Sequence, residues 1–467
     1  MLLYNNLLIN GNSDRHQPFL LNIVSGRRRL LQSSEFAVLK NMVNNKALDD
    51  EAQRLFDKLI QEKQFYTDEM RKTIEESLKN TGYWERESLY AEDYRFSIEL
   101  TRSCNMNCSF CYAASRNTAS SMSKEHVDAI MAFYEKHADS YKKIEDTPYI
   151  RITGGEPLLN GQTTALIQYI ADKWKKAKII LFTNGANLLE FYDCLPLNQL
   201  MEVHISIDGP PAIHSERRYP NNATSDTIFE NIIGGIQQLL KDEIDVKVKT
   251  VVDRNNYLYI EELRNLLKER RILDSPHCEH LVGVTLDYHN ALDIMDEVNN
   301  KQDIKEIETH LETLGILPST YPGLSIIQQM LMRTENRPFS PKCSRCNNKL
   351  LANYFFACNG RVYHCDCIED NVGVVGTFYP EARLYEEVAQ AFYERNIFSN
   401  SKCAVCAYKF VCLGGCPLGA RVKGEETDCS IFGDEEILDN LEFDDNLVFN
   451  KRWREKNHET DKEPGNY

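Results

Sequence analysis

The chain has 467 residues, of which 42% are hydrophobic and 27% charged, as in a globular protein with material for about two or three domains. Its formal net charge of −16 argues against a general nucleic-acid binder, because such proteins neutralise phosphates with Lys and Arg. No apolar run has the length of a membrane span, and the N-terminus lacks the features of a secretory signal, so a cytoplasmic protein without a membrane partner is predicted. Fifteen cysteines in such a compartment favour metal binding over disulfides.

Residues 1–93 carry no chemical motif and are predicted to form a small domain of strands and helices. Residues 19–25 and 28–31 flank Gly26 and predict a β-hairpin. Two helical patterns follow at residues 35–44 and 50–62. The second places four apolar side chains on one helix face, namely Ala52, Leu55, Phe56 and Leu59.

Residues 94–290 alternate strand and helix patterns, which predicts a parallel sheet with crossover helices. The expected strands are residues 96–100, 149–153, 179–183, 202–207, 246–252 and 282–287. The expected helices are residues 123–137, 162–175, 226–240 and 260–270. These units predict an α/β fold, a partial (β/α)6 barrel, whose functional side chains gather at the carboxyl ends of the strands.

Three cysteines follow the first expected strand. Cys104, Cys108 and Cys111 form a C-x3-C-x2-C array within the stretch T-R-S-C-N-M-N-C-S-F-C-Y. Three thiolates on one loop can hold three irons of a cubane cluster and leave the fourth iron open to a small molecule. Half of a zinc site, or three buried apolar cysteines, is the weaker interpretation, since structural zinc usually takes two separated pairs of ligands.

The second expected strand is followed by Gly154, Gly155, Glu156 and Pro157. Two glycines allow the backbone to approach a ligand closely, and the Glu156 carboxylate can accept hydrogen bonds from an ammonium group. A Gly-Gly turn before a glutamate is common in proteins. Its position one strand after the cysteine loop makes the pair of motifs a specific signal.

Polar residues also end the third and fourth expected strands. The third ends at Thr183 and Asn184, in a turn that could be only structural. Ser206 and Asp208 alternate with apolar neighbours, so they share one face of the fourth strand, which we expect to point into the barrel mouth. Arg218 follows and has the bidentate fork that suits a carboxylate ligand.

Residues 291–342 are predicted to form a helical bridge with a helix at 304–314, and residues 433–467 a C-terminal tail that is disordered from position 450. Between the bridge and the tail, residues 343–432 hold ten cysteines: Cys343, Cys346, Cys358, Cys365, Cys367, Cys403, Cys406, Cys412, Cys416 and Cys429. A zinc ribbon built from two of the C-x2-C pairs would leave six of them unexplained, so it ranks second to a cluster-binding domain. The isolated Cys194 and Cys278 are expected to be buried core thiols.

Together these motifs resemble the radical S-adenosylmethionine (SAM) enzymes, in the peptide-modifying branch that carries a C-terminal SPASM domain. The resemblance implies a [4Fe-4S] cluster on Cys104, Cys108 and Cys111, whose open iron chelates S-adenosyl-L-methionine for cleavage to a 5′-deoxyadenosyl radical. Arg218 would hold the methionine carboxylate, with Arg217 as its close competitor. The implied cofactor-binding residues are Phe110, Tyr112, Gly154, Gly155, Glu156, Pro157, Thr183, Asn184, Ser206, Asp208, Arg218 and Val252.

The same resemblance implies two auxiliary [4Fe-4S] clusters in residues 343–432. The cluster nearer the carboxyl end would take Cys403, Cys406, Cys412 and Cys429. The other would take Cys365, Cys416, Cys346 and Cys343, with the surplus Cys358 and Cys367 as alternatives to Cys343. Asp366 matches the proposed base of the sulfatase-maturing relatives, and an equal alternative is a carboxylate that tunes the neighbouring cluster.

The resemblance also implies a winged-helix-like domain in residues 1–93 that binds the leader of a precursor peptide as an added strand. A purely structural extension is equally compatible with the sequence. The predicted function is a peptide maturase that installs a cross-link, a thioether from cysteine as first choice, with flavodoxin or ferredoxin as electron donor. The alternatives are a sulfatase-maturating enzyme that forms formylglycine and a non-catalytic, zinc-stabilised binding module.

Overall fold

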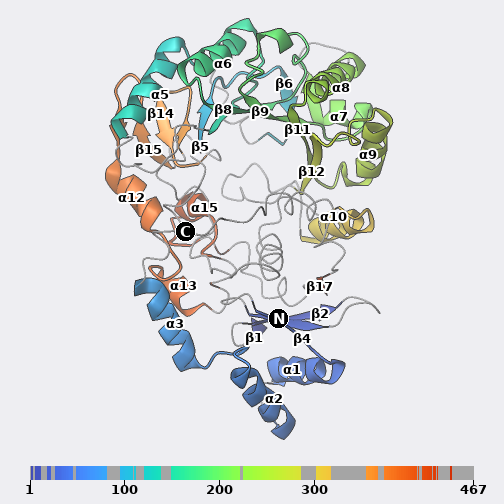
Figure 1. Cartoon of the computed structure of the whole chain (residues 1–467), viewed down its shortest axis with the longest axis vertical. Helices are drawn as coiled ribbons and strands as arrows, with labels where there is room; N and C mark the ends of the chain where they lie inside the picture. Colours follow the sequence, from blue (N-terminus) through green and yellow to red (C-terminus); the bar gives the residue numbers. More distant parts are fainter. Residues whose placement is uncertain are drawn as a thin grey trace, which may run out of the picture.

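The computed structural model describes residues 2–3, 6–11, 18–22, 27–45, 49–80, 95–108, 110–111, 120–137, 149–220, 225–284, 301–316, 354–365, 373–406, 409, 413–422, 424–427, 429 and 442–443. Helices cover the outside of an arched sheet, and the N-terminal elements lie at the opposite end of the molecule (Figure 1). None of the helices that the structure describes has the length and apolar character needed to cross a bilayer.

Six parallel strands form the predicted barrel sheet. They are β5 (Arg95–Glu99), β7 (Tyr149–Thr153), β8 (Lys178–Thr183), β9 (Leu200–Ser206), β11 (Asp245–Val252) and β12 (Cys278–Val284). Their order is β12-β11-β9-β8-β7-β5, and every neighbouring pair is parallel. All six overlap strands predicted from the sequence, so the predicted parallel sheet is confirmed.

Four crossover helices cover the convex face of this sheet: α5 (Lys124–His137), α6 (Gly161–Lys173), α8 (Ser225–Lys241) and α9 (Ile260–Glu269). They bury apolar side chains against alternate residues of the strands, so that Ile130 and Ile167 of the helices belong to the same buried core as Ile150 and Ile152 of β7. The short helix η3 (Tyr192–Cys194) connects β8 to β9. It turns Tyr192 inward and leaves Cys194 exposed, so the expectation that Cys194 is a buried thiol is wrong, whereas Cys278 is buried.

The cysteine-rich region begins by extending the same sheet. Strand β13 (Phe355–Phe356) pairs in parallel with β5, and β14 (Arg361–Tyr363), β15 (Val374–Thr377) and β16 (Arg383–Leu384) continue it in antiparallel fashion. Helices α12 (Glu386–Glu394), α13 (Ser401–Val405) and α15 (Pro417–Val422) follow. Aromatic side chains of β13 pack into the barrel core, with Phe356 5.8 Å from Phe96 between ring centroids. The barrel and the predicted cysteine-rich domain of residues 343–432 therefore share one sheet.

The N-terminal region forms its own sheet and core. Strands β1 (Leu2–Leu3), β2 (Asn6–Gly11), β3 (Phe19–Asn22) and β4 (Arg28–Leu30) are antiparallel, and β17 (Glu442–Phe443) adds a parallel pairing to β2. Helices α1 (Ser33–Asn45), α2 (Asp50–Gln61) and α3 (Asp68–Asn80) follow. The predicted hairpin and the first two helices are confirmed; β1, β2 and α3 were missed.

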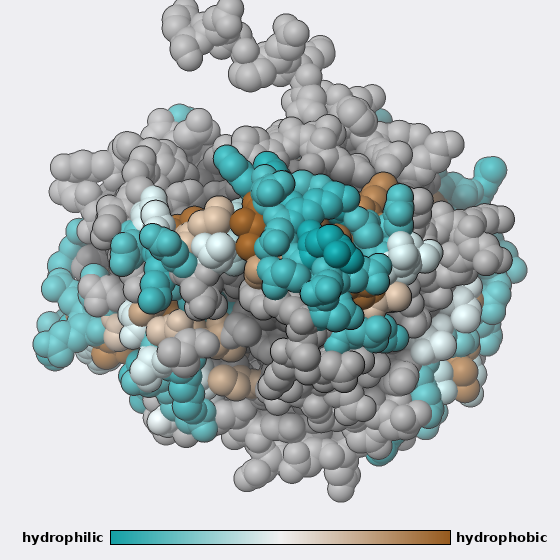
Figure 2. All heavy atoms as spheres, turned by 90° about the horizontal axis from the view of Figure 1, so that it is seen from below, coloured by the Kyte–Doolittle hydropathy of each residue, from teal (hydrophilic) through white to brown (hydrophobic). Residues whose placement is uncertain are grey.

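Helix α2 shows how this small core is closed. Asp49 caps the helix by accepting hydrogen bonds from the backbone N–H groups of Glu51 and Ala52. Leu55 and Leu59 are buried with Leu20 of β3. Viewed from below, the described surface is largely hydrophilic with smaller hydrophobic patches (Figure 2). The winged-helix assignment of this region stays a prediction.

Helix α10 (Lys301–Thr313) closes the other end of the barrel sheet. It matches the helix predicted at residues 304–314. Ile307 and Leu311 pack on Val252, Val282 and Val284, which are the last apolar residues of β11 and β12.

Candidate active site

The loop with three cysteines is anchored at its centre by a small antiparallel sheet. Strand β6 (Met106–Cys108) pairs with β10 (Arg218–Pro220), and the register places Cys108 opposite Arg218. Cys104 and Cys111 flank β6, and all three thiol residues are half-buried. The pairing was not predicted, because neither strand is long enough to show an alternating pattern.

Gly154 and Gly155 lie against the backbone segment that leads into the loop with three cysteines. The Gly155 N–H donates to the Thr101 carbonyl at 2.6 Å, and the Glu156 N–H donates to the Ser103 carbonyl at 3.0 Å. Gly154 has φ +150°, and a Cβ at either glycine would overlap the carbonyl oxygen of Thr101 or Ser103. The sequence predicted a close approach to a ligand here; the structure adds that both glycines approach the backbone that leads into the thiol loop.

Glu156 links the ends of β7 and β8. Its fully buried carboxylate accepts hydrogen bonds from Thr183 Oγ1 at 2.6 Å, Asn184 N at 2.7 Å and Leu158 N at 2.8 Å. Burial raises the pKa of Glu156, against the effect of these donors. Since a carboxylate has about four acceptor positions, one of them has no donor among the described residues and could accept from a ligand.

Asn184 connects this network to the thiol loop. Its Nδ2 donates to Asn105 Oδ1 at 2.7 Å and lies 3.9 Å from the Cys104 sulfur. The Met106 N–H lies 3.4 Å from the same sulfur. Asn105 was missed by the sequence analysis, although its place between two of the cysteines is a signal that could have identified it.

Asp208 and two arginines form the opposite wall of the site. Arg218 Nε lies 2.7 Å from Asp208 Oδ2, and Arg218 Nη1 lies 3.8 Å from the Cys108 sulfur. Arg217 donates from Nη1 to Asp253 Oδ2 at 2.7 Å, and its Nε lies farther from Asp208 Oδ2, at 3.9 Å. The guanidinium groups of Arg217 and Arg218 lie 4.6 and 5.2 Å from the centroid of the Phe110 ring. Of the two competing arginines, Arg218 is therefore the one that lies between Asp208 and the thiol of Cys108.

Removing the Asp208 charge is expected to destabilise the fold strongly. Asp208→Asn would leave Arg218, which is almost fully buried, without its carboxylate partner, at a cost of about 3–5 kcal/mol. The exposed pair of Glu230 and Arg270 is the matched control, and Glu230→Gln should cost about 0.2–1 kcal/mol. Melting temperatures of the two variants measure the difference, and equal losses would contradict the assigned ion pair.

The donor set of the thiol loop fits an iron–sulfur cluster. Burial raises the pKa of Cys104 to about 12 and also raises the pKa of Cys108, which Arg218 opposes, so metal binding would have to supply the compensating positive charge. Within the described part of the chain, no three His, Cys, Asp or Glu side chains are close enough to share one metal ion. In a cubane cluster each thiolate binds a different iron.

The remaining predicted cofactor residues occupy different environments. Ser206 is half-buried at the inner face of the sheet, and Pro157 is buried behind Glu156. The side chain of Val252 lies in the core under α10, so only its backbone remains for the predicted adenine contact. The predicted site residues that lie outside the described residues are Tyr112, Cys343, Cys346, Asp366 and Cys412.

Four of the described C-terminal cysteines lie before and after a turn that precedes α15 in the sequence: Cys403, Cys406, Cys416 and Cys429. Leu413, Gly414 and Gly415 of this turn all have positive φ, of 58°, 82° and 67°. Arg395 braces the turn by donating to the Gly414 and Gly415 carbonyls. The two predicted auxiliary ligand sets stay a prediction.

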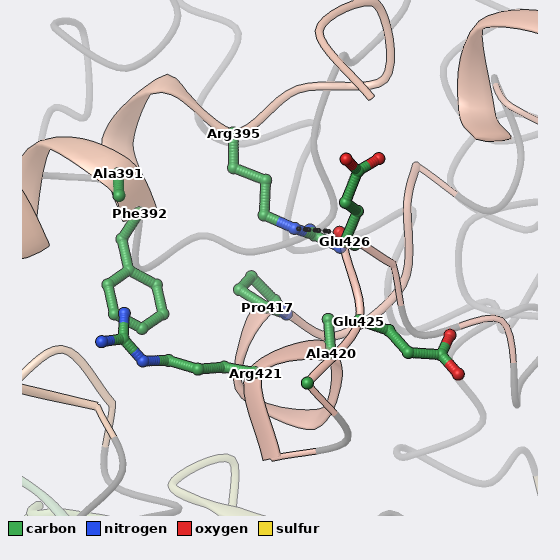
Figure 3. A pocket seen from close by; sticks show the side chains of 9 residues that line it. Ala391, Phe392, Arg395, Pro417, Ala420, Arg421, Glu425 and Glu426 are labelled. Carbon is green, nitrogen blue, oxygen red and sulfur yellow. Dashed lines mark hydrogen bonds between the residues drawn. The ribbon is translucent and has the colours of Figure 1, made fainter. Parts of the chain in front are cut away.

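A cavity of about 240 Å³ lies beside this turn, between α12 and α15. Arg421 lies over the Phe392 ring at 5.3 Å, and Arg395 donates to the Glu426 carbonyl at 3.4 Å (Figure 3). Both arginines on the cavity wall therefore have contacts within the protein.

Cys358 has a packing role in the described structure. Its sulfur lies 3.0 Å from Ser120 Oγ and 3.4 Å from a carboxylate oxygen of Glu99, which also pairs with Arg102 at 3.2 Å. Burial raises the pKa of Cys358 to about 12. These contacts join the turn after β13 to the barrel and offer an explanation for this surplus cysteine other than cluster binding.

The sequence and the fold were compared with protein families, with characterised proteins and with solved structures. The sequence profile described as "Radical SAM superfamily" matches residues 98–252. A GTP 3',8-cyclase of Synechocystis is 27% identical over 54% of this chain and 74% of its own length, and an AdoMet-dependent heme synthase of Oleidesulfovibrio alaskensis is 23% identical over 68% and 81%. SuiB of Streptococcus suis, solved with S-adenosylmethionine, aligns with a TM-score of 0.48 and 15% identity over 91% of this chain and 97% of its own.

Proposed function

The match over residues 98–252 identifies this chain as an enzyme of the radical SAM superfamily, and we propose that it is a peptide maturase. It would cross-link a ribosomally made precursor peptide, with a thioether from cysteine as the first choice. The observation that carries the proposal is the combination of two features. The thiol loop is held by the pairing of β6 with β10, and the N-terminal sheet ends at β4 among the residues that the structure describes. We place the enzyme in the cytoplasm, with flavodoxin or ferredoxin as its electron donor.

Different residues near the strand ends would bind the cluster and the two charged groups of the methionine moiety. Cys104, Cys108 and Cys111 would hold the [4Fe-4S] cluster, and bound S-adenosyl-L-methionine would supply the radical chemistry on reduction. Glu156 has one acceptor position for the ammonium group of that ligand. Arg218 offers the adjoining positive charge for a carboxylate.

The C-terminal cysteines are proposed to bind the electron acceptors of the reaction. Two auxiliary [4Fe-4S] clusters on residues 343–432 would accept an electron within the same chain, and Asp366 would hold or remove a substrate proton. Formylglycine formation in a sulfatase is the second function compatible with such an arrangement. It depends on Asp366, which lies outside the described residues.

The peptide part of the proposal is supported by the geometry of β4, the last strand of the N-terminal sheet among the described residues. The Asn22 N–H bonds the Arg27 carbonyl and the Leu31 N–H bonds the Pro18 carbonyl across β3 and β4. Antiparallel alternation then directs the N–H groups of Arg28 and Leu30 away from β3, and an added strand can pair with the N–H group of Leu30.

Leu30→Pro removes one of these outward N–H groups without breaking a bond to β3, because proline is tolerated on an edge strand. The affinity for a leader peptide should fall at least about fivefold. Fluorescence polarisation with labelled leader segments of short precursors encoded beside the gene measures the change. Leu30→Ala, which keeps the N–H, is the control, and equal binding by both variants would refute recognition at this edge.

The reaction is tested by incubating the anaerobically reconstituted enzyme with S-adenosyl-L-methionine, a strong reductant and the same full-length precursors. A thioether is expected to lower the peptide mass by two hydrogen atoms and to consume one alkylatable cysteine thiol. Loss of sulfur from a cysteine, or oxidation of a serine with all thiols retained, would favour formylglycine. An unmodified precursor from every candidate gene would count against the maturase.

A further inference from the structure

Two consecutive arginines approach the same carboxylate oxygen. Helix α7 (Pro211–Arg217) ends where β10 begins, so Arg217 and Arg218 belong to different elements. Arg218 Nε lies 2.7 Å from Asp208 Oδ2, and Arg217 Nε lies 3.9 Å from the same oxygen. Because Asp208 is fully buried, water screens its charge little. The two guanidinium groups therefore compete for one carboxylate.

A second carboxylate holds Arg217. Arg217 Nη1 donates to Asp253 Oδ2 at 2.7 Å, and Arg217 Nη2 donates to the Val251 carbonyl at 3.3 Å. The side chains of Arg217 and Asp253 are 6% and 3% exposed, so they form a buried ion pair. Removing one partner of such a pair is costly, because the other charge stays buried without compensation. Asp253 therefore fixes the direction in which the Arg217 guanidinium points.

Asn256 fixes the position of Asp253 relative to Asp208. The Asp253 N–H donates to Asn256 Oδ1 at 2.8 Å, and Asp253 Oδ1 accepts from the Asn255 N–H at 2.8 Å. Asn256 Nδ2 donates to the carbonyls of Asp208 and Val251, each at 2.8 Å. One buried amide thus connects the turn after β9, which carries one carboxylate, to the turn after β11, which carries the other.

Arg218 is the arginine that faces the thiol loop. Its Nη1 lies 3.8 Å from the sulfur of Cys108, which is also its partner in the pairing of β6 with β10. The Phe110 ring of the same loop lies 4.6 Å from the Arg217 guanidinium and 5.2 Å from that of Arg218. A movement of Arg217 toward Asp208 would therefore displace Arg218 from its partner and disturb the ring beside the thiols.

We propose that Asp253 is a positioning residue of the active site: it holds Arg217 away from Asp208, and so keeps Asp208 paired with Arg218. That Arg218 binds the carboxylate of S-adenosyl-L-methionine rests on the proposed function. The division of two arginines between two carboxylates rests on the contacts alone. Asp253 was not predicted from the sequence, where it lies 36 positions from Arg217.

The test compares two ligands of the anaerobically reconstituted full-length enzyme by equilibrium dialysis: S-adenosyl-L-methionine and its analogue without the carboxylate. The parent enzyme should prefer the carboxylate form at least about tenfold. Asp253→Asn releases Arg217 to pair with Asp208, so this preference should fall at least about fivefold. Asp253→Glu keeps the negative charge and should keep more of the preference than Asp253→Asn does.

The double variant Arg217→Met/Asp253→Asn removes the competing arginine together with its partner. It leaves neither charge of the pair buried alone, and Asp208 should again pair with Arg218, so the preference should return to within about threefold of the parent value. A purely structural role for Asp253 predicts an equal loss in the single and the double variant, and that result overturns the inference. An equal loss in Arg217→Met alone would assign the ligand carboxylate to Arg217 and would also overturn it.

Glu35→Gln is the matched control, because it removes a carboxylate from Arg29 in a partly buried pair of the N-terminal region, with both side chains 17% exposed. It should leave the ligand preference unchanged. An equal loss of preference in this variant would show that any destabilisation has the same effect, and would overturn the specific role of Asp253.

The parent enzyme separates a failure of the proposed function from a failure of the inference. Equal binding of the two ligands by the parent would refute carboxylate binding by Arg218. Melting temperatures then decide the pairing of Arg217 with Asp253. The double variant should melt higher than Asp253→Asn, because it has no unpaired Arg217. A double variant whose loss equals the sum of the two single losses would show no coupling between these residues and overturn the inference.

Discussion

Replacing Cys104, Cys108 and Cys111 with serine should remove about four irons from each reconstituted chain, because we propose these three thiols as the protein ligands of one cubane cluster. Iron analysis and the charge-transfer absorption of the protein measure the loss. The proposed auxiliary clusters would remain, so the variant should stay coloured. A drop to zero iron would mean that the C-terminal cysteines hold no cluster.

The control for this loss is Cys194→Ser, because Cys194 is exposed on η3 and lies outside both groups of cysteines. Its iron content should equal that of the parent chain. The triple serine variant should keep its melting temperature within a few degrees before reconstitution, since all three thiols are only half-buried. Unchanged iron in the triple variant would remove the cluster from this loop.

Gly155→Ala should disable the site without touching a thiol. The new Cβ would overlap the Ser103 carbonyl, so the backbone leading to Cys104 would have to move. Displacing a catalytic group by about 1 Å can cost about a hundredfold in rate, and we expect a loss of that size in 5′-deoxyadenosine formation. The crowding should also cost about 1–3 kcal/mol of stability.

Gly161→Ala is the matched control for this substitution. Gly161 begins α6, and a Cβ there would meet no atom within 4 Å. Alanine should leave the rate unchanged and stabilise the helix by up to about 1 kcal/mol. Equal rates for the two alanine variants would show that the glycine pair does not hold the thiol loop in place.

The barrel could be predicted from the sequence because its strands and helices carry strong local patterns. Every second residue of β11 from Val246 to Val252 is buried, and three of these four residues are valines. The thiol spacing marks the loop after β5 directly. Glu156 and Asp208 could be named as candidates because each closely follows a strand, and Arg218 because it lies downstream of Asp208 in the sequence. Their position in the sequence does not reveal which partner each one contacts.

The features that were missed depend on contacts between distant segments. The pairing of β6 with β10 joins residues more than a hundred positions apart, and β13 joins the barrel beside β5 from farther still.

The most direct measurement of the central claim is the amount of 5′-deoxyadenosine formed by the anaerobically reconstituted chain from S-adenosyl-L-methionine and a strong reductant. We expect continuing formation by the parent chain and none above background by the triple serine variant. Equal amounts from the two proteins, or none from a parent chain with its full iron content, would contradict the assignment of this chemistry to the thiol loop.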